Sequence, residues 1–403
     1  MDTGVTAFMI LSVSLVMLMT PGLAFFYGGL AGKRNILGIM MQTFVSLGLT
    51  TVLWIAFGYS LCFSGGEGGI IGDLKLAFLA NVPFDAMYSG NGKFPLYTFI
   101  AYQMMFAIIT PALITGAFVN RITFKGYLFF LIIWQLFVYY PFVHMVWGGG
   151  ILAKWGVLDY AGGIVVHATA GFAALASVFY IGKRRDTQSP PNSIPLVAIG
   201  TGLLWFGWYG FNAGSELNVD FNTTLAFLNT DVAASFAAVT WLIVEWVKTG
   251  KPKFVGLLTG SVAGLATITP AAGFVPLWAA MLIGIAAGLV CFWAVSLKNK
   301  LGWDDALDVW GVHGIGGVLG TILLGVFASK TVGIQAGLLE GDVSFFLKEV
   351  AAVIIAIVYA FGFTYLMLGL INYITPIRVT EEDELVGLDQ SLHGEKAYDE
   401  GAL

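Results

Sequence analysis

Long apolar runs without charged residues recur along the chain, and they restrict its fold more than any other feature. Only 11% of the 403 residues are charged, whereas a soluble domain carries about 25%, and the mean hydropathy is +0.85. A helix of about 20 mainly apolar residues can span the hydrocarbon core of a bilayer. Because a helix also satisfies its own backbone hydrogen bonds in lipid, the sequence predicts an all-α polytopic membrane protein.

Charged or turn-forming segments, such as AGKRN at 31–35, divide the apolar sequence into eleven predicted spans. No basic segment precedes the first run, so we expect it to be a retained span and not a cleaved signal peptide. The eighth run is the shortest. The spans cover residues 5–30, 36–63, 97–119, 124–145, 162–181, 195–214, 229–247, 254–268, 274–297, 309–328 and 345–374.

Lysine and arginine are distributed unevenly between the connections, and cytoplasmic loops of membrane proteins are the ones rich in them. Twelve cations lie in odd-numbered connections: Lys33, Arg34, Arg121, Lys125, Lys183, Arg184, Arg185, Lys248, Lys251, Lys253, Lys298 and Lys300. Five lie in even-numbered connections or at the start of the last span: Lys75, Lys93, Lys154, Lys330 and Lys348. Odd connections are therefore predicted to be cytoplasmic, with the N-terminus outside and the C-terminus inside.

The charge of the chain divides it into a membrane domain, residues 1–375, and an acidic cytoplasmic tail, residues 376–403. The tail carries eight carboxylates and only two cations, Arg378 and Lys396, so it accounts for the net charge of −5. The membrane domain has no basic field that would attract nucleic acid. We expect no nucleic-acid partner. The sequence also ends at Leu403 without a kinase-like output domain, which argues against an autonomous sensor.

Two histidines lie in apolar sequence, His167 in AGGIVVHATAGF and His313 in VWGVHGIGGV. They fall in the fifth and tenth predicted spans. This spacing predicts two five-helix repeats of opposite orientation, about 1–190 and 191–330, with an eleventh helix at about 345–374. Transporters built from inverted repeats place their functional site at the interface between the repeats.

Ionisable groups inside a membrane are costly and usually mark a functional site, although a histidine can also be a satisfied core residue. Burial disfavours a charged imidazole, so we expect both rings to be neutral. Each then has one donor and one acceptor, and the pair could share a hydrogen bond and bind a small neutral guest. No intramembrane Cys, Asp or Glu completes a metal site, so no cofactor is expected. Haem ligation by the two histidines is the less favoured alternative.

Two aspartates precede the histidine segments, Asp159 by eight residues and Asp308 by five. Each is in a position to cap a helix N-terminus, because a carboxylate there accepts hydrogen bonds from free backbone amides. Asp159 could also add negative potential beneath an outer cation site.

Aromatic residues gather at the predicted outer ends of several spans. Trp147 lies in HMVWGGG, Tyr102 and Phe106 are four residues apart, and Phe211 and Ser215 lie in GWYGFNAGS. Most such residues in membrane proteins form interfacial belts. An aromatic face beside a hydroxyl also suits a small cation, because a desolvated cation–π contact contributes up to ~2 kcal/mol.

The sequence resembles the ammonium transporters of the Amt/Mep/Rh group over nearly its whole length. The motifs that carry the resemblance are PGLAFFYGG, HMVWGGG, DYAGGIVVHATAG, GWYGFNAGS, TPAAG, DVWGVHGIGG and GLDQSLHGEKAY. The tryptophan of HMVWGGG and the tail motif favour the prokaryotic Amt branch over the Rh branch.

The resemblance implies a homotrimer in the cell membrane, with eleven helices and one pore in each subunit. It implies an outer ammonium site formed by Trp147 and Ser215, with Phe106 as its floor. Phe106 and Phe211 would form a gate. Relatives often have phenylalanine where this chain has Tyr102, whose hydroxyl could join the outer site.

Below the gate, the resemblance implies a pore lined by His167 and His313, which could also relay a proton. Asp159 would support recruitment and deprotonation. Ammonium would then cross as ammonia, with methylammonium as an analogue substrate, and the tail would help a PII-type signalling protein dock. The alternatives are an ammonium sensor that signals through the tail and a haem-binding redox protein.

Overall fold

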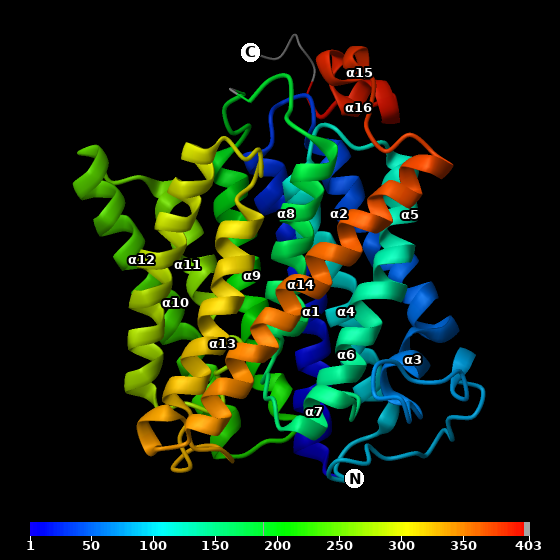
Figure 1. The fold of residues 1–403 in the computed structure, drawn as a ribbon, viewed down its shortest axis with the longest axis vertical. Coiled ribbons are helices and arrows are strands. Elements are labelled where there is room, and N and C mark those ends of the chain that lie inside the picture. Colours follow the sequence, from blue (N-terminus) through cyan, green and yellow to red (C-terminus); the bar gives the residue numbers. More distant parts are fainter. Residues whose placement is uncertain (188, 399–403) are drawn as a thin grey trace.

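The computed structural model describes residues 1–187 and 189–398, and over these residues the chain is helical, with no β-strand. Most of the helices run along the long axis of the molecule, and the N-terminus lies at the opposite end from α15 (Glu381–Val386) and α16 (Leu388–His393) (Figure 1). The last five positions of the predicted acidic tail, 399–403, lie outside the described residues. The all-α prediction is confirmed.

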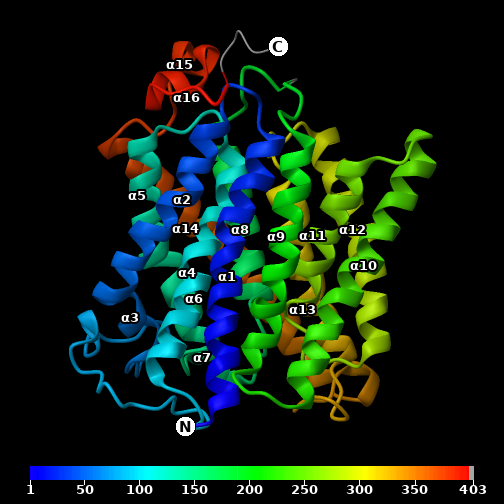
Figure 2. The same ribbon diagram turned by 180° about the vertical axis from the view of Figure 1, so that it is seen from behind.

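The helices fall into two groups that lie side by side (Figures 1 and 2). The first group is α1 (Thr3–Leu30), α2 (Ile36–Leu53), η1 (Trp54–Gly58), α3 (Tyr59–Phe63), η2 (Ala77–Leu79), α4 (Leu96–Phe118), α5 (Phe124–Trp134), η3 (Gln135–Tyr139), α6 (Tyr140–Val146), α7 (Ile151–Trp155), η4 (Gly163–Ala168) and α8 (Thr169–Ile181). The second is α9 (Ile194–Ala213), η5 (Gly214–Glu216), α10 (Phe221–Thr249), α11 (Phe254–Ile268), α12 (Leu277–Leu301), η6 (Trp310–Gly314), α13 (Ile315–Phe327) and η7 (Leu338–Glu340), followed by α14 (Val343–Ile374).

Each predicted span coincides with a helix or with consecutive helical segments. Ten of these are long and apolar enough to cross a membrane, and α11 is a shorter apolar helix of 15 residues. The multi-pass character is therefore confirmed, whereas the total of eleven spans stays a prediction.

Polar side chains fix where several helices begin. Asp2, Thr123, Ser193, Asp220 and Asp342 each accept a hydrogen bond from a backbone amide in the first turn of α1, α5, α9, α10 and α14. These caps satisfy amides that have no partner within the helix. The apolar sequence thus sets the extent of each helix, and the cap sets its first residue.

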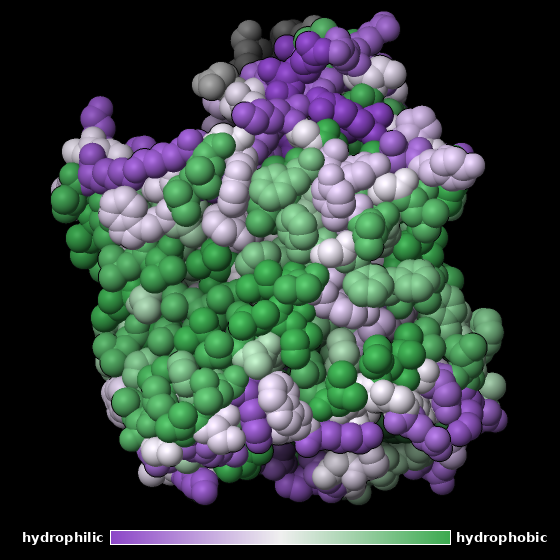
Figure 3. Space-filling view, viewed as in Figure 1, coloured by the Kyte–Doolittle hydropathy of each residue, from purple (hydrophilic) through white to green (hydrophobic). Residues whose placement is uncertain are grey.

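The surface matches a protein surrounded by lipid. On the face shown in Figure 3, a hydrophobic band covers the middle of the molecule and hydrophilic residues gather at both ends. The predicted cytoplasmic loops meet the tail at one of these ends: Arg34 donates to the carbonyl of Leu385 at 2.7 Å, and Arg185 pairs with Glu381. The orientation of the two termini across the membrane stays a prediction.

Glycines allow close packing between helices. Helices α1 and α9 pack along most of their length, and a Cβ atom on Gly200 would lie 2.3 Å from the backbone nitrogen of Phe26. In lipid, such close approach replaces the hydrophobic drive that joins helices in water.

Candidate functional site

The two histidine segments begin with short π-helical turns, η4 and η6, which continue into α8 and α13. Asp159 caps the first segment. Its Oδ1 accepts from the amides of Gly162 and Gly163 at 2.8 and 2.6 Å, and its Oδ2 accepts from those of Ile164 and Val165 at 2.9 and 3.0 Å. The capping role expected for Asp159 is therefore present, and backbone donors occupy both oxygens of its carboxylate.

The second histidine segment is capped by Asp305, so the expectation for Asp308 was wrong. Asp305 accepts from the amides of Val309 and Trp310 at 3.1 and 2.7 Å. Asp308 instead has a left-handed backbone, with φ of 60°, and its carboxylate pairs with Lys298 at 2.6 Å. Asp305 precedes His313 by the same eight residues that separate Asp159 from His167. That shared spacing was the signal available in the sequence.

Two glycines bring the histidine segments together. A Cβ atom at Gly171 would lie 2.1 Å from the Cα of Gly314, and one at Gly317 would lie 2.9 Å from the Cβ of His167. Each glycine follows its own histidine by four residues and faces the other segment. The crossing therefore needs glycine on both sides.

His167 and His313 meet at this crossing. Their Nδ1 atoms are 3.3 Å apart, and the rings stack with centroids 5.3 Å apart at 19°. One nitrogen donates and the other accepts, because a neutral imidazole has one of each. Both side chains are buried, and His167 Nε2 has no hydrogen-bond partner. The predicted hydrogen bond between the rings is present, with a further polar atom left over.

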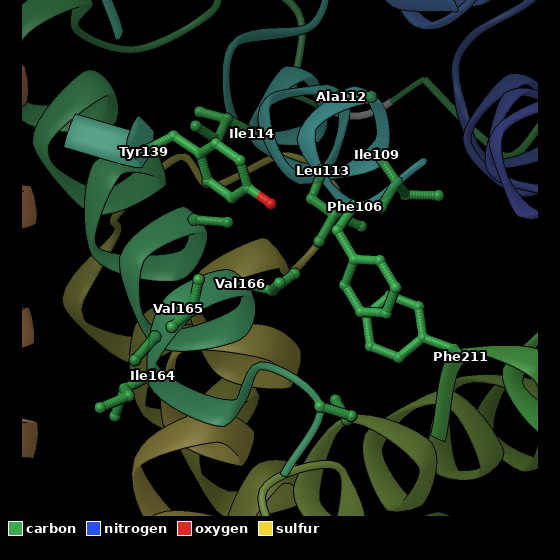
Figure 4. Close-up of a cluster of buried hydrophobic side chains, with 14 of the residues drawn as sticks. Phe106, Ile109, Ala112, Leu113, Ile114, Tyr139, Ile164, Val165, Val166 and Phe211 are labelled. Carbon is green, nitrogen blue, oxygen red and sulfur yellow. The ribbon is translucent and has the colours of Figure 1, made fainter. Parts of the chain in front are cut away.

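Aromatic rings enclose the histidines on one side. Phe106 from α4 and Phe211 from α9 lie against each other, with ring centroids 4.2 Å apart and the ring planes tilted by 31° (Figure 4). Phe211 lies 6.0 Å from the ring of His167, and Trp208 stacks on the same imidazole at 5.4 Å. The two phenylalanines thus cover the approach to His167.

A very small space lies beside the two histidines and is bounded on one side by Phe211. Its volume is about 10 Å³, which is at the lower limit for holding one water molecule. Apart from the two imidazoles and the indole of Trp208, its lining is apolar: Met19, Leu23, Phe26, Ile109, Leu113, Val166, Leu204, Phe211 and Val262. The space cannot provide a hydration shell for an ion.

The residues expected at the outer site are brought together above Phe106. The ring of Trp147 lies edge-on to that of Phe106, with centroids 5.9 Å apart. The Nε1 of Trp147 donates to the carbonyl of Asp159 at 2.8 Å. The ring centroids of Tyr102 and Phe106 are 5.0 Å apart, and the Tyr102 hydroxyl lies 3.1 Å from Ser215 Oγ. Trp147 and Ser215 are half-buried. The sequence-predicted residues therefore form one continuous cluster.

Two carboxylates near this cluster were missed. Tyr160 donates to Glu216 Oε2 at 2.8 Å, and the amide of Leu158 donates to Glu349 Oε1 at 2.7 Å. Glu216 directly follows Ser215 in the sequence, so its position could have been noticed. Glu349 lies on α14, far away in sequence, and no local pattern marked it.

An ion-pair cluster joins the two groups of helices at the end near the tail. Asp304 accepts from Arg121 Nη1 at 2.6 Å and from Arg184 Nη2 at 2.7 Å. Burial alone would raise the pKa of Asp304, but the hydrogen bonds from Arg184 and the charge of Arg121 hold it below its ordinary value.

The geometry is unsuited to haem. An iron between the two imidazoles would need space between the ligating nitrogens, and the Nδ1 atoms are already within hydrogen-bond distance. Among residues 1–187 and 189–398, no group of three or more His, Cys, Asp or Glu side chains could hold a metal ion.

Comparison with known proteins places these features in context. A sequence model described as the Ammonium Transporter Family matches residues 7–398. An ammonium transporter of Bacillus subtilis (strain 168) is 45% identical over 403 residues, 99% of each chain. One of Aquifex aeolicus (strain VF5) is 46% identical over 400 residues, 99% of this chain and 94% of the relative.

Solved structures of other proteins also resemble this chain. The crystal structure of Saccharomyces cerevisiae Mep2 has a TM-score of 0.89 and 34% identity, covering 95% of this chain and 88% of that one. A structure described as a sensor Amt protein has a TM-score of 0.87 and 29% identity, covering 95% of this chain and 96% of that one.

Proposed function

Because the chain belongs to the ammonium transporter family, we propose how this multi-pass protein of the cell membrane moves its substrate. Ammonium binds at the outer cluster around Trp147 and Ser215. It loses a proton beneath the gate formed by Phe106 and Phe211. Ammonia then passes the histidine pair and takes up a proton on the cytoplasmic side.

The observation that carries this proposal is the paired histidines in an apolar space of about 10 Å³. Potassium cannot enter such a space, because an ion there would lose its hydration without compensation. Ammonium can surrender a proton and continue as a neutral molecule. His167 Nε2, which is buried without a partner, offers that molecule a hydrogen bond.

The outer cluster suits the charged form of the substrate. The ring faces of Trp147 and Phe106 attract a cation, and Ser215 and Tyr102 supply hydroxyl oxygens within 3.1 Å of each other. The tyrosine hydroxyl also lies 2.9 Å from the carbonyl of Phe211. Tyr102 therefore links the outer site to the gate residue.

Asp159 supports this site indirectly. Its carboxylate holds the first amides of η4, and its carbonyl accepts the indole N–H of Trp147. We propose that it stabilises the position of Trp147 and contributes negative potential beneath the cation without touching it.

Membership of the family also guides what we propose for the assembly and partners of this chain. We propose a homotrimer with one pore in each subunit, and docking of a PII-type protein against the cytoplasmic face that carries the tail. The transporter would hold no cofactor and make no covalent change in its substrate other than proton transfer.

Ammonium-evoked current in proteoliposomes under a controlled potential tests the selectivity argument. We expect ammonium or methylammonium to enter the vesicles while potassium produces no current above that of empty liposomes. A potassium current comparable to the ammonium signal would contradict passage through a dry pore.

Ammonium sensing is a second candidate function, supported by the similarity to a structure described as a sensor Amt protein. Flux measured with and without residues 376–403 separates the two. A transporter keeps substantial flux in both forms, whereas a sensor shows little flux in either.

A further inference from the structure

A carboxylate that the proposed cycle does not use lies beside the outer cluster. Glu216 ends η5 and directly follows Ser215. Its side chain is half-buried, and its Oε2 accepts a hydrogen bond from Tyr160 at 2.8 Å. Across residues 1–187 and 189–398, no lysine or arginine pairs with it. Its negative charge is therefore not neutralised by a protein cation.

Tyr160 holds this carboxylate from a rigid position. The ring lies edge-on to Phe274 at 5.1 Å, and a Cβ atom on Gly273 would lie 2.2 Å from it. The Tyr160 amide donates to the carbonyl of Pro270 at 3.1 Å. Burial, and to a smaller extent the charge of Glu216, raise the pKa of Tyr160 well above its ordinary value. The phenol therefore keeps its proton and acts as the donor.

The same segment positions the aromatic part of the outer site. Tyr160 follows Asp159, whose carbonyl accepts the indole N–H of Trp147. Glu216 thus connects to the cluster twice, through its neighbour Ser215 and through its hydrogen bond to Tyr160.

The turn after Glu216 is also fixed. Leu217 has a left-handed backbone with φ of 55°, a conformation that a leucine rarely adopts. Its amide donates to the carbonyl of Gly214 at 3.0 Å, and its own carbonyl accepts from Asn91 Nδ2 at 2.7 Å. A loop from the other group of helices therefore holds the turn that carries Glu216.

The other carboxylates near the cluster each accept a hydrogen bond from a backbone amide, including Glu349, whose Oε1 accepts from the amide of Leu158. Both oxygens of Asp159 accept amide hydrogen bonds at the start of η4. Asp220 caps α10 by accepting from the amide of Thr223 at 3.1 Å. Glu216 differs from them because, among residues 1–187 and 189–398, its hydrogen-bond donor is the phenol of Tyr160 and not a backbone amide.

We propose that Glu216 supplies the negative charge that draws ammonium to the outer site and sets the apparent affinity of that site. The inference rests on the outer site of the proposed function. A fixed, partly desolvated charge raises the local concentration of cations at an entrance. It attracts potassium equally, so Glu216 affects recruitment, and the gate and histidines below it determine selectivity.

Methylammonium uptake into proteoliposomes tests this role. At about 10 mM salt, where screening extends over about 30 Å, we expect Glu216→Gln to raise KM about fivefold with little change in kcat. Glu216→Lys raises KM further. The difference in KM between these variants and wild type shrinks at about 100 mM salt.

Asp85→Asn is the matched control, because Asp85 is an exposed carboxylate of the loop between α3 and α4. We expect this change to leave KM unchanged.

Tyr160→Phe separates charge from structure, because it removes the hydrogen bond and keeps the carboxylate. We expect a smaller rise in KM than for Glu216→Gln, with the salt dependence retained. Equal, salt-independent effects of the two variants would overturn the proposal in favour of a structural contact. Unchanged KM in both Glu216→Gln and Glu216→Lys would overturn it too. Trp147→Leu, assayed in parallel, shows whether the outer site itself stands.

Discussion

At the scale of single residues, the polar groups in the proposed pathway are held in place by specific hydrogen bonds. The two histidines share one hydrogen bond at 3.3 Å, and Trp147 is held by the carbonyl of Asp159. The hydroxyl of Tyr102 lies 3.1 Å from Ser215 Oγ. These contacts leave ring faces and one imidazole nitrogen for the substrate.

Replacing Trp147 with leucine should weaken recruitment. The change removes a ring face that a cation contacts, a contribution of up to ~2 kcal/mol. We expect KM for methylammonium to rise about tenfold, with a smaller effect on kcat. The check is the concentration dependence of uptake, and an unchanged curve would remove Trp147 from the site.

Much of the site was predictable at this scale, because its residues are unusual for their surroundings. Histidines inside apolar runs, and aromatics next to Ser215, stand out in a sequence with few polar intramembrane groups. The expectation that Asp308 caps the second histidine segment was wrong. Asp305 keeps the eight-residue spacing of Asp159 and His167 and faces the free amides, whereas Asp308 pairs with Lys298.

At the scale of elements, the π-helical turns and the glycines four residues after each histidine set the distance between the rings. Hydropathy predicted where the helices lie, because burial in lipid requires long apolar runs. It could not predict the π-helical turns, because these depend on how Asp159 and Asp305 cap the two histidine segments and on how those segments cross. We propose that the shared spacing of aspartate, histidine and glycine marks two repeats, about 1–190 and 191–330.

Gly317→Ala tests the crossing. Its Cβ would lie 2.4 Å from the carbonyl oxygen of Gly163, so the backbones must separate. Overpacking of this kind costs about 1–3 kcal/mol, and we expect a lower Tm in detergent and reduced uptake.

Gly362→Ala on α14 is the matched control, because no atom lies within 4 Å of the added Cβ. An alanine in an open helical position stabilises by about 0.5–1 kcal/mol. If Gly317→Ala behaved like this control, the close crossing would not be required.

At the scale of the whole molecule, the buried cluster of Arg121, Asp304 and Arg184 joins the two groups of helices. Removing one partner from a buried pair costs about 3–5 kcal/mol. We therefore expect Asp304→Asn to lower Tm clearly, whereas Glu381→Gln, which breaks the exposed pair with Arg185, changes it little. Thermal unfolding in detergent measures both, and equal shifts would contradict the cluster's role.

The pH dependence of the same cluster follows from the sign of the pKa shift. The pKa of Asp304 is lowered in the folded protein, so its stabilising effect is complete above the unfolded value of about 3.9 and is lost as pH falls below it. The difference in Tm between wild type and Asp304→Asn should shrink on acidification below about pH 4. A difference that stays constant would show that the ion pair is not its source.

The central claim, that the substrate crosses a dry pore past two histidines, is tested most directly with His167→Ala and His313→Ala. Methylammonium uptake and ammonium-evoked current would be measured in proteoliposomes together with potassium permeability. Because each change removes a buried hydrogen-bonding group, we expect transport to fall by about tenfold or more in both variants. If both variants transported substrate at the wild-type rate and still excluded potassium, the histidine pair would have no part in conduction.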